Sequence, residues 1–260
     1  MRQLFPHITL LLMLALSCAP DTTNIAEQIP AQKHPNQRNL VVVIHGGGDS
    51  PEDWANDLIE VIATRVTSPD TWAYSAIDWH ADAEDRMSAA RTGFRLGEDL
   101  GEELAAQQEY THIVFIAHSV GSFVAHGALT TLDEHRENQT VPTTHVIFLD
   151  PFTARGVVRW NYGDSRFGKG ADVAQTYLNS DDSAPSTNDA PSETYTIDVT
   201  QLRPDDYPEG RWHWWPIDAW QHLLLNSSRE DVGLHALEQS AENPSLFHKT
   251  YPRGSQVTLK

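Results

Sequence analysis

The chain has 260 residues, with 36 acidic and 18 basic side chains, and its formal net charge is -18. This balance excludes a nucleic-acid-binding protein, because phosphate contacts need clustered lysine and arginine. With 40% hydrophobic and 21% charged residues, the composition is that of a folded globular domain. The single cysteine, Cys18, excludes an intramolecular disulfide and a zinc site built from several thiolates.

The first residues have the pattern of an export signal. A short basic start, MRQ, precedes a largely apolar run of nine residues, Ile8 to Leu16. This run is too short for a lasting transmembrane helix and is typical of the hydrophobic part of a signal peptide. The residues that follow, ALSC at 15–18, resemble a bacterial lipobox, in which the cysteine carries lipid. The alternative is a plain signal peptide that is cut after Ala19.

These signals predict the domain organisation and the location of the protein. We expect a signal peptide at 1–17, the lipid-bearing Cys18 with a polar tether at 18–37, and a folded domain at 38–260. The protein is then exported and anchored in a bacterial cell envelope, or, in the alternative, secreted or periplasmic. Because the chain is strongly acidic, membrane attachment would depend on the lipid and not on attraction to anionic headgroups.

Beyond the tether, apolar runs alternate with amphipathic segments. The apolar runs predict strands at 40–44, 71–77, 112–117 and 144–149, and weaker ones at 172–178 and 195–200. The amphipathic segments predict helices at 51–65, at 83–108 with Met87 on the apolar face, at 120–132, and twice within 217–240. This alternation is typical of an α/β domain, in which helices cover both faces of a mostly parallel sheet.

The turn after the strand at 112–117 contains a candidate nucleophile. Residues 117–121 read AHSVG, which is the G-x-S-x-G nucleophile elbow with alanine at the first small position. A tight turn from strand to helix needs small residues on both sides of the serine, and it exposes the serine hydroxyl at the edge of the sheet. We therefore assign Ser119 as a nucleophile. The alternative is a serine in a small-residue turn that only packs a helix on the sheet.

A second loop offers backbone donors for an oxyanion. His45 and three glycines follow the first strand, and glycine lets backbone N–H groups approach a bound acyl oxygen closely. We assign the oxyanion hole to the amides of Gly47 and Val120, and expect His45 to hold the loop. A dinucleotide-binding loop would need G-x-G-x-x-G, whereas this chain has GGGDSP.

The acid of a catalytic triad has more than one candidate. Asp150 directly follows the strand at 144–149 and precedes Pro151, so its carboxylate should lie at the same sheet edge as Ser119. Asp181 and Asp182 end the next strand segment and are the alternatives. The clearer strand and turn pattern favours Asp150.

The base is assigned by its position in a loop. His213 follows the last clear strand, in the segment GRWHWWPIDAW, and a loop position suits a catalytic histidine. His222 and His235 fall on predicted helices and are interpreted as surface or interhelical residues.

Four motifs together resemble one known family. HGGGDSPEDW at 45–54, IDW at 77–79, AHSVG at 117–121 and LDP at 149–151 are similar, in order and spacing, to the pancreatic lipase superfamily of α/β-hydrolases. The resemblance implies an α/β-hydrolase fold in a single domain, an oxyanion loop at the His-Gly start, and the acid at Asp150. The chain departs from the family in its elbow alanine and in having no cysteines at 38–260 to brace a lid, and we expect no C-terminal β-sandwich of the kind found in the vertebrate enzymes.

From these residues we predict a lipase-like or esterase-like serine hydrolase. Ser119, Asp150 and His213 would cleave neutral acyl esters through an acyl-serine intermediate, with no cofactor and no metal. An acyltransferase or peptidase with the same triad, or a non-catalytic binding protein on this fold, are the alternatives. The expected partners are a small-molecule or lipid ester and, through the lipid, a membrane.

Two segments are candidates for substrate contacts. The aromatic residues Trp212, Trp214, Trp215 and Trp220 surround the proposed base and would either line an apolar acyl pocket or belong to the core. Residues 152–170 combine apolar side chains with four glycines and are a candidate flap over the site.

Overall fold

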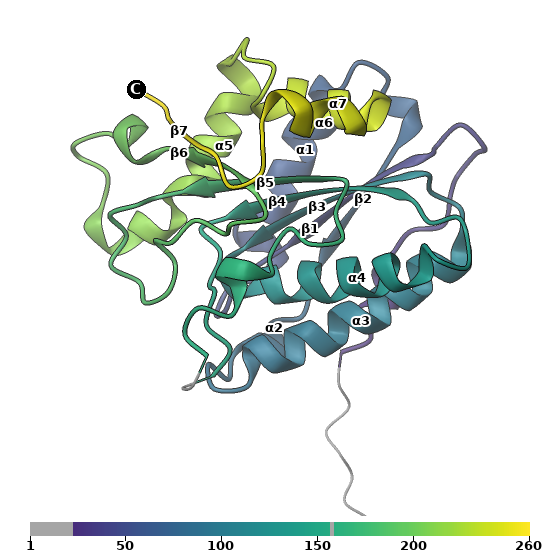
Figure 1. Cartoon of the computed structure of the whole chain (residues 1–260), viewed down its shortest axis with the longest axis horizontal. Helices are drawn as coiled ribbons and strands as arrows, with labels where there is room; N and C mark the ends of the chain where they lie inside the picture. Colours follow the sequence, from purple (N-terminus) through teal and green to yellow (C-terminus); the bar gives the residue numbers. More distant parts are fainter. Residues whose placement is uncertain (1–22, 157–158) are drawn as a thin grey trace, which may run out of the picture.

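A single sheet of seven parallel strands, in the order β2-β1-β3-β4-β5-β6-β7, forms the centre of the molecule (Figure 1). The computed structural model describes residues 23–156 and 159–260. The strands are β1 (Asn39–Ile44), β2 (Trp72–Ile77), β3 (His112–His118), β4 (Thr143–Leu149), β5 (Val173–Leu178), β6 (Tyr195–Asp198) and β7 (Gln256–Thr258). The predicted fold class is confirmed, and β7 is an addition that the sequence did not indicate.

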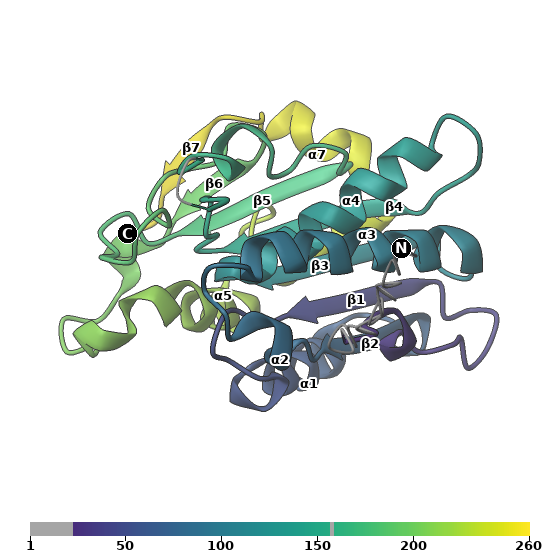
Figure 2. The ribbon, with the colours of Figure 1, turned by 90° about the horizontal axis from the view of Figure 1, so that it is seen from below.

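Helices cover both faces of the sheet (Figures 1 and 2). One face carries α3 (Ala89–Gln107) and α4 (Ser122–His135), and the other carries α1 (Ala55–Arg65), α5 (Trp215–Asn226), α6 (Gly233–Glu242) and α7 (Pro244–Thr250). Alternate side chains of β1 point to opposite faces: Val42 packs in the core beneath α3 and α4, and Val43 packs in the core beneath α1 and α5. Both faces of the sheet are therefore buried, which explains why its strands read as continuous apolar runs.

The helix predicted at 83–108 is divided in the structure. A short helix, α2 (His80–Ala83), ends before α3 begins at Ala89. Between them, the Asp85 carboxylate accepts hydrogen bonds from the backbone N–H of Met87 at 3.0 Å and from the hydroxyl of Ser88 at 2.7 Å. Such local bonds compete with helical hydrogen bonding. Met87, which was expected on the apolar face, is 75% exposed.

Part of the segment predicted as a tether packs against the folded domain. Ile25 and Ile29 flank a short 3₁₀ helix, Ala26–Gln28, and both are buried in the core beneath α3. The Gln28 side chain donates to the backbone carbonyl of Asp78 at 2.8 Å and accepts from its N–H at 2.7 Å. Residues 23–37 therefore pack against the domain, because two isolated isoleucines bury themselves without an apolar period along the segment.

The expected signal peptide at 1–17 and the expected lipid on Cys18 lie outside the described residues. Within the described part of the chain, no helix combines the length and the apolar character that crossing a membrane requires.

The parallel sheet brings distant loops to one edge. Because all strands run in the same direction, the loops that follow β1, β3, β4, β5 and β6 leave the sheet at the same side. This edge is where ligands bind in open α/β sheets. Every residue that the sequence predicted for the catalytic site lies in one of these loops or at the start of the helix that follows.

Candidate active site

Ser119 stands in a strained turn between β3 and α4. Its backbone φ of 52° lies in the left-handed region, which a non-glycine residue adopts rarely and mostly at functional sites. The turn is closely packed: a Cβ on Gly121 would lie 2.4 Å from the carbonyl oxygen of His45, and a Cβ on Gly46 would lie 3.0 Å from the Cβ of Ser119. Gly121 is therefore required within the elbow, and Gly46 is required in the loop after β1 that faces Ser119.

Ser119 opens into a cavity of about 420 Å³ that it shares with His213, Gly47 and Val120. The remaining walls are mainly apolar and comprise Ala83, Arg86, Ala89, Phe152, Trp160, Ala184, Pro185 and Thr187. No hydrogen bond joins the Ser119 hydroxyl to His213 within the described residues. In substrate-free sites such contacts are often long and tighten when substrate binds. The four residues predicted for the nucleophile, base and oxyanion hole thus lie around one space.

The turn that carries Asp150 is attached directly to the elbow. The backbone N–H of Phe152 donates to the carbonyl oxygen of Ser119 at 3.1 Å. Asp150 itself has a φ of 43° and is 0% exposed, and one of its carboxylate oxygens accepts the backbone N–H of Asn179 at 2.8 Å. The buried carboxylate is therefore fixed in position by neighbouring backbone.

Two carboxylates, and not one, face the same nitrogen of His213. The Nδ1 atom lies 3.2 Å from Oδ2 of Asp150 and 2.9 Å from Oδ2 of Asp182. Asp182 is 5% exposed and also accepts a hydrogen bond from the hydroxyl of Thr187 at 2.8 Å. Both carboxylates can accept the single Nδ1–H, which leaves Nε2 of the neutral imidazole free to take a proton from Ser119.

The pKa values of the three groups move in different directions. Burial raises the pKa of Asp150 to about 7. Burial also acts to raise the pKa of Asp182, but hydrogen bonds from His213 and Thr187 outweigh it and lower that pKa to about 2. For His213, burial acts to lower the pKa, and the hydrogen bonds to Asp150 and Asp182 outweigh it and raise that pKa to about 9. Near neutral pH, Asp182 is therefore ionised to a greater extent than Asp150.

The structure places the alternative acids and histidines of the sequence analysis in different surroundings. Asp181 is exposed and forms an ion pair with Arg203 at 2.6 Å, so it does not face His213. Its neighbour Asp182 does, which the sequence pattern alone did not distinguish. His222 and His235 are exposed on α5 and α6, as expected, while His213 lies in a short 3₁₀ helix, Glu209–Trp214, and not in an open loop.

His45 holds the loop after β1, in which the sequence predicts the oxyanion hole. Its Nδ1 atom lies 2.8 Å from the carbonyl oxygen of Gly46, and its Nε2 accepts the backbone N–H of Trp79 at 3.2 Å. His45 is fully buried. Both ring nitrogens are engaged, so this histidine supports the loop that presents Gly47 to the cavity.

None of the four tryptophans near the proposed base lines the cavity that contains Ser119. Trp215 and Trp220 are buried in the core beneath α1 and α5, and Trp212 stacks on the guanidinium of Arg203 at 4.1 Å. The aromatic walls of the cavity are instead Phe152 and Trp160, from the segment predicted as a flap. Residues 157–158 of that segment lie outside the described residues.

Asp150, Asp182 and His213 are also the types of group that bind metal ions. One donor atom from each lies within 4.8 Å of the others. Both carboxylate oxygens lie within hydrogen-bonding distance of Nδ1 of His213. These hydrogen bonds explain the close approach of the three atoms without a metal ion.

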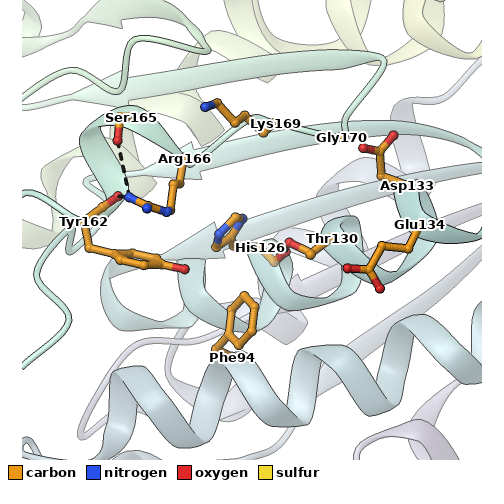
Figure 3. Close-up of a pocket in the computed structure, with 10 residues that line it drawn as sticks. All are labelled: Phe94, His126, Thr130, Asp133, Glu134, Tyr162, Ser165, Arg166, Lys169 and Gly170. Carbon is orange, nitrogen blue, oxygen red and sulfur yellow. Dashed lines mark hydrogen bonds between the residues drawn. The ribbon is translucent and has the colours of Figure 1, made fainter.

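A second hollow, of about 400 Å³, lies between α3, α4 and the residues around 162–170 (Figure 3). His126 stands at its centre, and its buried Nδ1 has no partner within the described residues. Burial, followed by the charges of Arg155, Arg166 and Lys169, lowers its pKa to about 4. The hydroxyl of Ser165 contacts Arg166 and that of Thr130 donates to the backbone carbonyl of His126, so neither of these hydroxyls in the described hollow is hydrogen-bonded to the His126 ring.

The fold and the elbow define the class of protein. Residues 41–245 match the model of the alpha/beta hydrolase family. The chain belongs to this family. No curated protein matches the chain, and the narrower resemblance to the pancreatic lipase superfamily stays a prediction.

Two solved structures illustrate the similarity. A lipase-esterase related protein from Clostridium acetobutylicum ATCC 824 is similar at 12% identity and a TM-score of 0.30, over 48% of this chain and 45% of that one. A protein described as a cell surface hydrolase from Lactobacillus plantarum WCFS1 is similar at 12% identity and a TM-score of 0.41, over 68% of this chain and 77% of that one. The chain therefore spans less than half of the Clostridium structure.

Proposed function

We propose that this hydrolase cleaves neutral carboxylic esters through an acyl-serine intermediate. The observation that carries the proposal is the shared cavity, which is lined by Ser119 in its strained turn, by His213, and by Gly47 and Val120, while Nδ1 of His213 is held by buried carboxylates. This is the arrangement that activates a serine hydroxyl and stabilises an oxyanion.

Each residue has a distinct role in the proposed reaction. Ser119 Oγ attacks the ester carbonyl while Nε2 of His213 takes its proton, and the amides of Gly47 and Val120 donate to the oxygen that becomes negative. Asp150 orients the imidazole and stabilises its charge. The protonated histidine then gives its proton to the departing alcohol, and a water molecule, activated by the same nitrogen, releases the acid.

The cavity walls support an uncharged acyl group. Ala83, Ala89, Val120 and Phe152 contribute apolar surface next to Ser119, and a chain of formal charge -18 disfavours the approach of anionic substrates. An ester with a small or medium apolar acyl chain fits this lining better than a charged one.

A fluorophosphonate probe that labels activated serines tests the function. We expect the native protein to be labelled and to hydrolyse nitrophenyl esters, and Ser119→Ala to do neither while remaining folded. If the native protein is not labelled, a binding role without catalysis replaces the proposal. If it is labelled but hydrolyses no nitrophenyl ester, an acyltransferase or peptidase is the better interpretation.

We also propose that Cys18 anchors the mature protein to a bacterial envelope membrane. The proposal is supported by the ALSC sequence after the apolar run at 8–16. Replacement of Cys18 by serine should move the protein from the membrane fraction to the soluble fraction without changing esterase activity. A native protein that is soluble and lacks lipid by mass spectrometry would favour the plain signal peptide.

A further inference from the structure

His213 has one more carboxylate than the proposed reaction needs. Asp150 comes from the loop after β4 and Asp182 from the loop after β5, yet their Oδ2 atoms lie 3.2 and 2.9 Å from the same Nδ1. We propose that Asp150 and Asp182 form a double orienting acid, in which either carboxylate can hold the imidazole of His213 when the other is removed. This inference rests on the serine hydrolase function proposed above.

Each carboxylate is held in place independently of the other. Asp150 receives the backbone N–H of Asn179 on its Oδ1 atom, which leaves Oδ2 directed at His213. Asp182 receives the Thr187 hydroxyl, and its own backbone N–H donates to the carbonyl oxygen of Asn179 at 3.0 Å. Loss of one side chain therefore leaves the other with its own support and with its contact to Nδ1.

The surroundings differ enough for the two acids to contribute unequally. Asp150 is completely buried, whereas Asp182 lies at the edge of the substrate cavity, where its partner Thr187 is part of the wall. Arg203, which is paired with Asp181, contributes a positive charge on the Asp182 side. A carboxylate near a cation and hydrogen-bond donors stays ionised more readily than one in an apolar environment. We therefore expect Asp182 to carry most of the charge that faces the imidazole.

Single and double asparagine variants test this inference. With one carboxylate retained, Nδ1–H keeps an acceptor and the imidazole keeps its tautomer, so Asp150→Asn and Asp182→Asn should each lower kcat by about tenfold or less. The double variant leaves no carboxylate, and kcat should fall on the order of 10⁴-fold, as expected when a triad acid is lost. The loss of kcat in the double variant then exceeds the product of the losses in the single variants, as expected when each carboxylate can take the place of the other.

Matched variants separate orientation of His213 from support of the cavity wall. Asp181→Asn alters the neighbouring carboxylate, which is exposed and directed at Arg203, and should leave kcat unchanged. Thr187→Val removes the hydroxyl that holds Asp182 while Asp150 stays on His213, so it should lower kcat no more than Asp182→Asn does. If Asp182 had only a structural role, Asp182→Asn would leave kcat of the folded variant unchanged, and the double variant would lose no more kcat than Asp150→Asn.

The hydrogen-bonded proton on Nδ1 offers a second readout that does not depend on turnover. A histidine N–H bonded to carboxylate gives a far-downfield proton resonance, which should remain in both single variants and vanish in the double variant. Melting temperatures establish that each variant is folded. The inference is overturned if either single variant loses as much kcat and the same resonance as the double variant. If the native protein lacks all esterase activity and probe labelling, the proposed function fails instead, and the resonance still reports whether both acids hold His213.

Discussion

The imidazole of His118, next to the proposed nucleophile, faces two hydrogen-bond acceptors. Its Nε2 lies 3.0 Å from the carbonyl oxygen of His213, and its Nδ1 lies 3.3 Å from Oδ2 of Asp49. A carbonyl oxygen can only accept a hydrogen bond, so Nε2 must carry a proton. The contact between Nδ1 and the Asp49 carboxylate is a hydrogen bond only if a second proton lies between these two atoms. His118 and Asp49 are 1% and 6% exposed, so bulk water does not separate them. This chain of contacts connects the oxyanion loop to the backbone of the proposed base.

Replacement of Asp49 tests whether that chain positions His213. In Asp49→Asn, the side-chain amide can donate to Nδ1 of a neutral His118, so the contact to the His213 carbonyl persists and kcat should change little. In Asp49→Ala, Nδ1 has no partner, and a displaced base should lower kcat by up to about 100-fold with KM little affected. The two variants are compared with a nitrophenyl ester beside their melting temperatures. Full kcat in the folded alanine variant would show that His213 is positioned without this chain.

The raised pKa of His213 predicts an enzyme that works best in alkaline solution. The two carboxylates raise this pKa to about 9 against the effect of burial. A general base must be unprotonated, so kcat/KM should increase as the pH rises toward 9 and level off above it, because the profile of kcat/KM reports the free enzyme. A plateau that begins near 6.5, the ordinary value for histidine, would mean that the carboxylates do not hold a proton on the imidazole.

At the scale of elements, α4 is fixed by its contact with α3. A Cβ on Gly97 of α3 would lie 2.0 Å from the carbonyl oxygen of Val124, and a Cβ on Gly127 of α4 would lie 2.1 Å from the carbonyl oxygen of Phe94. The two backbones therefore touch at these glycines. Because α4 begins directly after the Ser119 turn, the crossing also determines where the nucleophile stands relative to the sheet.

Gly97→Ala should separate the two helices and destabilise the protein. The new methyl group has no space, so the backbone of α4 must shift, and the cost is expected to be about 1 to 3 kcal/mol or more. Gly210→Ala is a matched control, because a Cβ at Gly210 would meet no atom within 4 Å. Chemical unfolding of both variants measures the difference in the free energy of unfolding. Equal stability of the two variants would contradict the tight crossing.

The elements that could be predicted from sequence are those with local signals. β1, β3 and β4 are uninterrupted apolar runs because both sheet faces are buried, and the elbow follows from small residues around Ser119. β7 has three residues, none of them fully buried, and gives no such signal. The approach of Asp182 to His213 depends on how the loop after β5 folds against Thr187. Contacts of this kind are tertiary, so residue type and spacing could not rank Asp182 above Asp181.

At the scale of the whole molecule, buried histidines whose pKa values are lowered make the fold sensitive to acid. Burial lowers the pKa of His112 to about 4, of His145 to about 3 and of His126 to about 4. In the unfolded chain these groups titrate near 6.5. Below that pH the unfolded state binds more protons than the folded state, so the stability that is present above it is lost as the pH falls. Asp150, whose pKa is raised to about 7, acts in the opposite direction but offsets only part of the effect.

His126→Phe tests this dependence with little change in packing. His126 lies among the rings of Phe94, Tyr162 and Phe167, and its Nδ1 has no partner within the described residues, so a phenyl ring replaces it without breaking a hydrogen bond of that nitrogen. Between about pH 6 and pH 4.5, the free energy of unfolding of the native protein should fall more steeply than that of the variant, by up to about 1.4 kcal/mol per pH unit.

Urea unfolding at several pH values measures the two slopes, and His222→Gln, which alters an exposed histidine on α5, should keep the native slope. Any packing cost of the phenyl ring changes the free energy of unfolding by the same amount at every pH. The test therefore compares only the slopes of the free energy of unfolding against pH. Equal slopes in the native protein and His126→Phe would mean that His126 takes up its proton in the folded state. The lack of a hydrogen-bond partner would then not keep this imidazole neutral.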